Sequence, residues 1–97
     1  MFDQMKAVLK AKAIQNELKK TEIDAVSRDH LVKVTVTGEL KLKQIQLADA
    51  IVQPGRKAEL EHLLQTTIAE GLAQAQQIAA ERTREVMKEM GVNLPGF

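Results

Sequence analysis

Apolar and polar residues alternate along residues 31–47, on both sides of a Gly-Glu pair. Such alternation predicts strands with one covered face, and Val, Ile and Thr suit a pleated surface. The alternate positions of the first strand are all valine: Val32, Val34 and Val36. Gly38 is expected to supply the positive φ of a tight turn, so the segment is predicted to be a β-hairpin. A hairpin alone is marginally stable in water and needs other strands or helices to cover it.

The apolar positions change phase in the second strand of this hairpin. Leu40 and Leu42 share a face, but the next apolar residues are Ile45 and Leu47. Because side chains alternate with a period of two, this odd step predicts a β-bulge or a strand whose buried face changes sides. A short strand is also predicted over residues 22–27, so the sheet has at least three antiparallel strands.

Residues 2–20 have the spacing of a helix with two apolar stripes. The first stripe consists of Phe2, Met5 and Leu9. The second, on the opposite side, consists of Ala7, Ala11, Ile14 and Leu18. A surface helix usually has one stripe, so two indicate that one side packs on the sheet and the other on a second subunit. The alternative is that the small alanines simply face solvent.

A second helical pattern runs from Pro54, which is acceptable in a first turn, to Met90, with Gly91 as a natural stop. Its apolar stripe consists of Leu60, Leu64, Ile68, Leu72, Ala75, Ala79, Val86 and Met90. One helix over residues 54–90 would be about 55 Å long, whereas a compact domain of this size is only about 32 Å across. The helix must therefore project, break at Gly71, or pack on another chain. We expect an unbroken helix whose far end is covered by a partner, most simply in a homodimer.

Composition and charge narrow the function. The 97 residues are predicted to form a single domain, 1–97, and the absence of cysteine fits a reducing cytoplasm. No signal peptide and no apolar run long enough to span a bilayer is recognised, so we expect a soluble, cytoplasmic protein. The net charge is only +1, but residues 1–43 carry nine basic and six acidic residues (+3), and residues 44–97 carry five and seven (−2). An anionic partner is therefore expected to meet the first helix and the hairpin.

Residues suited to catalysis are scarce. The single serine, Ser27, has no obvious triad, and His62 lacks a second metal ligand at helical spacing because Ala58 and Thr66 occupy those positions. His30 is expected in a loop and, like His62, to be solvated. No Gly-rich phosphate loop is present. We therefore predict no enzymatic activity, no cofactor, no metal site and no small-molecule substrate.

Clustered basic residues are the candidates for contact with a nucleic acid. The candidate DNA contacts are Lys6, Lys10, Lys12, Lys41, Lys43, Arg82, Arg84 and Lys88. Such residues can neutralise phosphates, although charge on a helix surface is usually just solvated, and glutamates are interleaved with the C-terminal basic group. The strands have no aromatic residue on which a base could stack, so double-stranded DNA contacted through its backbone is favoured over single strands or RNA.

Several strings, in this order and spacing, resemble the YbaB/EbfC family of bacterial nucleoid-associated proteins. They are Leu-Val-Lys-Val-Thr-Val-Thr-Gly at 31–38, Ile-Gln-Leu at 45–47, Leu-Glu-His-Leu-Leu at 60–64 and Met-Gly-Val-Asn-Leu-Pro-Gly-Phe at 90–97. The resemblance implies an α+β protein of order α-β-β-β-α, with a three-stranded antiparallel sheet between two long helices and a tweezer-like homodimer. It also implies binding to double-stranded DNA with low sequence specificity, for nucleoid organisation or gene regulation.

The alternative is a non-catalytic protein-interaction module, a chaperone or assembly factor that grips a protein partner between its helices. The Ala- and Gln-rich part of the second helix and the near-neutral charge favour this alternative. A salt titration of duplex binding separates the two, because only contact with the DNA backbone predicts a steep fall of affinity with salt.

Overall fold

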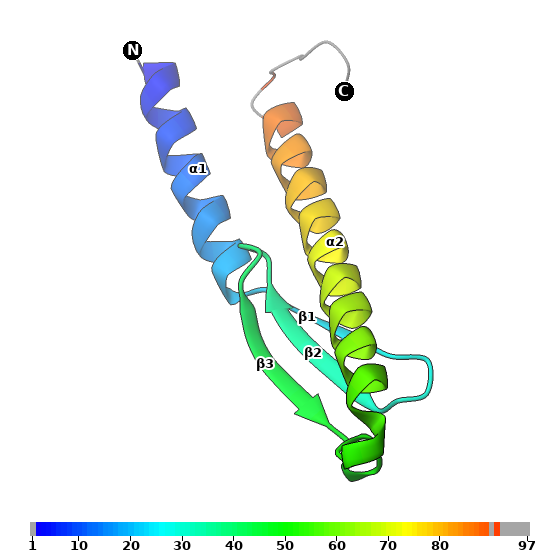
Figure 1. Ribbon diagram of the computed structural model, residues 1–97. Helices are drawn as coiled ribbons and strands as arrows, with labels where there is room; N and C mark the ends of the chain where they lie inside the picture. Colours follow the sequence, from blue (N-terminus) through cyan, green and yellow to red (C-terminus); the bar gives the residue numbers. More distant parts are fainter. Residues whose placement is uncertain (1, 90, 92–97) are drawn as a thin grey trace.

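The computed structural model describes residues 2–89 and Gly91. The chain forms α1 (Phe2–Lys20), β1 (Glu22–Val26), β2 (Val32–Thr37), β3 (Leu42–Leu47) and α2 (Lys57–Glu89), as Figure 1 shows. Two short 3-10 turns, Asp49–Ile51 and Pro54–Arg56, lead from β3 into α2. The predicted α+β class and the α-β-β-β-α order are confirmed. In space, α2 lies across the sheet, while α1 extends away from one end of it (Figure 1).

The three strands form one antiparallel sheet in the order β1-β2-β3. Thr35 pairs with Gln44, but the next residue, Val36, pairs with Leu42, so Lys43 is an extra residue in β3. The β-bulge predicted from the phase shift is therefore confirmed. Its effect is to return the apolar residues of β3 to one side: Leu42, Ile45 and Leu47 pair with the three valines of β2 and share their face.

The core lies between α2 and the valine face of β2. Val32, Val34 and Val36 are fully buried, as the alternation predicted. The helix approaches the sheet most closely through Thr67, Gly71 and Ala75, which are spaced four residues apart and buried. The predicted stripe of Leu60, Leu64, Ile68 and Leu72 lies beside this line and is only half-buried, because the sheet is narrow and β3 is not covered. Met90 and the side chain of Phe2, members of the predicted stripes, lie outside the described residues.

Gly71 does not break α2; it is a position where the helix packs against the sheet. α2 is continuous for 33 residues, or about 50 Å at 1.5 Å per residue, so the prediction of an unbroken helix is confirmed. A Cβ built at Gly71 would lie 3.4 Å from the Ala25 Cβ and 3.5 Å from the Val34 Cγ2. The molecule is correspondingly elongated, with extents of 62 × 25 × 15 Å and a radius of gyration of 17.9 Å, against about 12.5 Å for a compact chain of this length.

Gly38 serves a different purpose from the one predicted. Its φ is not positive; the left-handed residue of the turn is Leu40, with φ 68°. The loop between β2 and β3 is short, and short hairpin loops often place the left-handed residue last, after a type I turn. A glycine is instead required at position 38 because there is no space for a side chain. A Cβ there would lie 2.8 Å from the Leu18 carbonyl oxygen and 2.9 Å from the Leu18 Cδ2. The hairpin thus rests directly on the end of α1.

α1 makes little contact within the single chain. Only Ile14 and Leu18, from one of the two predicted stripes, are half-buried. Ala7 and Ala11 are exposed, and so are Met5, Val8 and Leu9, at 69%, 56% and 66%. Within one copy of the chain, the side expected to pack on the sheet is covered only at Ile14 and Leu18, its alanines are exposed as in the alternative, and the side expected to meet a second subunit is exposed.

Candidate nucleic-acid interface

The two helices run in opposite directions as a pair of arms (Figure 1). Ion pairs join one arm to the other. Arg82 Nε lies 2.5 Å from Glu17 Oε2, and Arg82 Nη1 lies 3.1 Å from Glu85 Oε2. The hydrogen bond to Glu17, followed by that to Glu85, raises the pKa of Arg82. Farther along the arms, Lys10 Nζ lies 3.6 Å from Glu89 Oε2. Two of the predicted DNA contacts, Lys10 and Arg82, are therefore already balanced by carboxylates.

The surface between these ion pairs is apolar. A hollow there is lined by Leu9, Ala13, Ile14 and Val86 in addition to the paired charges. Val86 is 5% exposed, although it lies far along α2 from the sheet. The inner side of the arms therefore combines an apolar floor with neutralised charges, which is a poor setting for a phosphate.

The other predicted contacts on the arms lie at more open positions. Lys6 and Lys12 on α1 and Lys88 on α2 are exposed, and Arg84 lies one turn before Lys88. Lys6, Lys12 and Lys88 make no ion pair with another described residue. These three lysines can therefore neutralise a phosphate without first losing a carboxylate partner.

The remaining two predicted contacts lie at the base of the arms, with two lysines that sequence analysis had not selected. Lys41 and Lys43 line a hollow together with Lys19 and Lys20 from the last turn of α1. We call these four residues the basal lysines. Lys43 is ion-paired with Glu22 at the start of β1. No sequence pattern could have revealed this group, because it depends on the hairpin resting on α1.

The face of the sheet away from α2 is polar and carries its own ion pairs. Thr35 Oγ1 donates a hydrogen bond of 2.7 Å to Asp24 Oδ1, and Lys33 Nζ lies 3.6 Å from Asp24 Oδ2. The Thr35 hydroxyl, and then the charge of Lys33, lower the pKa of Asp24 against an opposing effect of burial. This face therefore carries balanced charge across β1 and β2.

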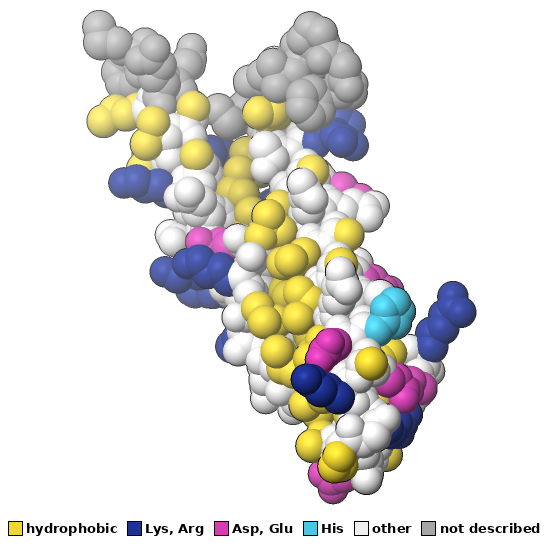
Figure 2. Space-filling model, viewed as in Figure 1, with side chains coloured by type: hydrophobic (Ala, Val, Ile, Leu, Met, Phe, Trp, Pro, Cys, Tyr) yellow, Lys and Arg dark blue, Asp and Glu magenta, His cyan; other side chains and the backbone are white. Residues whose placement is uncertain are grey.

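A different surface, along β3, is apolar and open. Every residue of β3 is exposed, including Leu42 at 45%, Ile45 at 43% and Leu47 at 39%. Figure 2 shows hydrophobic side chains in a band along this side of the molecule, between β3 and α2. β3 is also the last strand of the sheet, so one of its backbone edges has no strand beside it among the described residues. An edge of this kind, with an apolar face, is a template for pairing with another chain.

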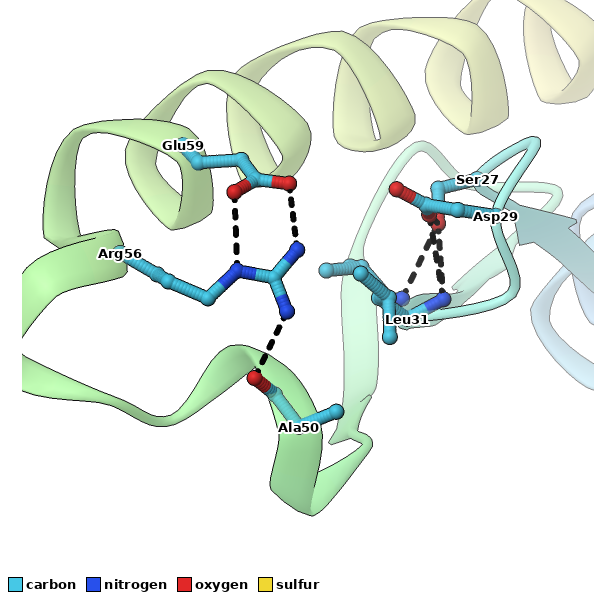
Figure 3. Close-up of polar contacts among 7 residues, drawn as sticks. Ser27, Asp29, Leu31, Ala50, Arg56 and Glu59 are labelled. Atoms are coloured by element: carbon cyan, nitrogen blue, oxygen red, sulfur yellow. Dashed lines mark hydrogen bonds and ion pairs between the residues drawn. The ribbon is translucent and has the colours of Figure 1, made fainter.

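The Ser27 hydroxyl is engaged in hydrogen bonds within its own turn, as Figure 3 shows. Its hydroxyl donates to Asp29 Oδ1 at 2.7 Å and accepts from the backbone N–H groups of Leu31 and Val32 at 3.2 and 3.1 Å. The bond from Ser27 is the main cause of the lowered pKa of Asp29. The hydroxyl therefore closes the turn between β1 and β2, in which His30 has φ 60°.

The start of α2 is fixed by Arg56 in the same region (Figure 3). Its guanidinium binds Glu59 through two hydrogen bonds of 2.9 and 2.6 Å, and donates a third, of 2.8 Å, to the Ala50 carbonyl oxygen. The bonds from Arg56 lower the pKa of Glu59. This arrangement ties the 3-10 turns to the first turn of the helix.

Within residues 2–89 and Gly91, no group of three or more His, Asp or Glu side chains is placed to hold a metal ion. Neither helix, over the same residues, combines the length and the apolar character needed to cross a bilayer.

The geometry defines a class: a small α+β protein with a three-stranded sheet, two projecting helical arms and basic residues along both. A model of the YbaB/EbfC DNA-binding family matches residues 1–90. A nucleoid-associated protein of Moorella thermoacetica is 34% identical over 85 residues, which are 87% of this chain and 79% of the relative. One of Roseiflexus sp. strain RS-1 is 33% identical over 84 residues, 87% of this chain and 81% of the relative. The chain belongs to the YbaB/EbfC family, as the sequence strings indicated.

The fold has a counterpart among solved structures. The crystal structure of an uncharacterized protein, HP0035 of Helicobacter pylori, matches with a TM-score of 0.71 at 18% identity. The match covers 88% of this chain and 96% of that one. At this level of identity the likeness establishes a shared fold.

Proposed function

We propose that the protein is a homodimer that binds double-stranded DNA through its phosphate backbone, with low sequence specificity, in nucleoid organisation or gene regulation in the cytoplasm. The observation that carries the proposal is the match of residues 1–90 to a DNA-binding family. It is supported by exposed lysines on the arms and at their base, which are suited to phosphates. The described strands offer no aromatic platform for unpaired bases, which favours a duplex over a single strand.

The second copy is supported by the apolar surface of β3. Leu42, Ile45 and Leu47 together form a strip that one α2 helix does not cover. Pairing with another copy would bury this strip and supply partners for the open backbone edge. The exposed Met5, Val8 and Leu9 of α1 provide further apolar area for such a contact.

Low sequence specificity is supported by the type of side chain available. The exposed basic residues of the arms are mostly lysines, which act as point charges toward phosphates. Phosphate contacts fix position on the duplex and carry no sequence information.

The second candidate is a module that grips a protein partner between its arms. The apolar hollow lined by Leu9, Ile14 and Val86 favours it, because an apolar side chain would fill that space better than a phosphate. Binding through this hollow would depend only weakly on salt, in contrast to binding of a DNA backbone.

The test is to measure the affinity of the protein for a short DNA duplex at increasing salt concentration. The molecular mass of the protein in solution is measured on the same samples. Phosphate contact predicts that log K falls against log salt with a slope of about −0.9 for each phosphate neutralised. A flat response, or no binding at low salt, contradicts the proposal and favours the protein-partner alternative.

The dimer is tested separately by placing a charge in the strip. Ile45→Lys should give a monomer, whereas Val26→Lys, which is matched in exposure (40% against 43%) but lies on the opposite face at β1, should stay a dimer. An Ile45→Lys protein with the mass of a dimer would show that β3 is not the interface.

A further inference from the structure

We propose that the basal lysines form a phosphate-binding site for duplex DNA at the root of the arms. The proposal rests on the proposed function and assigns it a place: Lys19 and Lys20 at the end of α1, with Lys41 just before β3 and Lys43 within it. Glu22 and Glu39 also line this hollow.

The site is held together by the contact between the hairpin and α1. The Gly38 N–H group donates to both the Leu18 and the Thr21 carbonyl oxygens, at 3.0 Å each; Leu18 lies in the last turn of α1 and Thr21 directly follows the helix. The Thr37 N–H group donates to the Lys41 carbonyl at 2.8 Å, which closes the turn and fixes where β3 begins. Lys19 and Lys20 therefore have a defined position relative to Lys41, even though their side chains are exposed.

The balance of charge favours this hollow over the space between the arms. Four lysines face two glutamates here, a net of +2, and among the described residues only Lys43 is ion-paired. Between the arms, Lys10 and Arg82 face Glu17 and Glu89 across the corresponding hollow, a net of 0. Because exposed charges act over about 10 Å at 0.1 M salt, a phosphate is attracted to the base and not to the inner side of the arms. Residues 1–43, which contain the whole hollow, also carry the net positive charge of the chain.

Most of the hollow lies away from the surface that the proposed dimer would bury. Glu22, to which Lys43 reaches, pairs with Thr37 and alternates with the buried Ile23, so it lies on the face of the sheet away from α2. The apolar strip of β3 lies on the other face, and only its first residue, Leu42, also lines the hollow. Figure 2 shows Lys and Arg side chains gathered at the end of α1 nearest the sheet, on the surface of the molecule. Two copies would therefore present two such sites to one duplex.

The experiment compares three proteins in the duplex salt titration. In the basal variant, K19Q/K20Q/K41Q, the slope should become shallower by about 0.9 for each phosphate that is no longer neutralised, or about 2.7 for all three lysines. The control, R28Q/K33Q/K57Q, removes the same charge from exposed or half-buried positions outside the hollow and the candidate arm residues, and it should keep a slope close to that of the wild type. Thermal unfolding of all three proteins shows whether each is folded as the wild type is.

Each outcome decides one proposal. Equal flattening of the slope in the basal and control variants would mean that only net charge matters, and would overturn the site. A basal variant that binds like the wild type would also overturn it, while the proposed function would stand. A wild type that does not bind duplex DNA, or binds without salt dependence, would instead overturn the proposed function.

Discussion

Two buried glycines should respond to the same substitution with opposite signs. Gly71 lies on α2 where the helix crosses the sheet, and Gly38 lies in the hairpin turn against α1. The sequence suggests one as a helix-weakening glycine and the other as a turn residue with positive φ. The space around them differs, so Gly71→Ala is expected to stabilise the protein and Gly38→Ala to destabilise it.

The magnitudes follow from the distances. At Gly71 the new Cβ would meet Ala25, Val34 and Val36 side chains at 3.4, 3.5 and 3.6 Å, which is ordinary contact. Alanine gains about 1 kcal/mol of helix propensity over glycine, and a buried methyl adds up to about 0.8 kcal/mol. The free energy of unfolding should therefore rise by about 1–2 kcal/mol, which raises the melting temperature by about 4–8 °C for each kcal/mol.

At Gly38 the same Cβ would lie 2.8 Å from a backbone oxygen and 3.0 Å from the Leu18 Cα, neither of which can move freely. The hairpin must shift, which strains packing by about 1–3 kcal/mol and weakens two hydrogen bonds worth about 0.5–1.5 kcal/mol each. A net decrease of about 2–4 kcal/mol in the free energy of unfolding is expected.

The assay is urea unfolding followed by circular dichroism, with all proteins at one concentration because a dimer's stability depends on it. Gly55→Ala is the control, since a Cβ there meets nothing within 4 Å and reports only the effect on the unfolded chain. Gly71→Leu tests the space itself and should destabilise. A Gly71→Ala protein less stable than the wild type by about 1 kcal/mol or more, the size of the propensity gain, would refute the packing derived for α2.

Two further predictions concern the core and the carboxylates. Val34→Ala removes two methyl groups from a fully buried side chain and should lower the free energy of unfolding by about 2 kcal/mol, measured in urea; a decrease below about 0.5 kcal/mol would contradict its place in the core. Asp24, Asp29 and Glu59 have lowered pKa values in the folded protein. Their contribution to stability is therefore fully present above their ordinary pKa values, 3.8 for the aspartates and 4.5 for Glu59. It disappears as the pH falls through the lowered values. The melting temperature should therefore drop between about pH 5 and about pH 2, the range where native carboxylates titrate, and an unchanged value would contradict these hydrogen bonds.

The candidate interface was only partly predictable. Spacing and charge identified basic residues, but only the fold shows that Lys10, Lys43 and Arg82 are ion-paired. The carboxylates that neutralise Lys10 and Arg82 include Glu89 and Glu17, each on the opposite helix and far away in the sequence. Helical spacing identifies neighbours three or four residues apart, so it could not reveal partners across the two arms.

The sequence by itself determined the periodic features of this protein. The valines of β2, the phase shift that became the bulge at Lys43, and the unbroken length of α2 follow from local repeats of two and 3.6 residues. The tertiary structure decided which surfaces meet: that Gly38 rests on Leu18, that α2 contacts the sheet through Gly71, and that the basal lysines lie together. The physical reason is that a repeat is set by backbone geometry within one element, whereas contact and charge balance depend on elements distant in the chain.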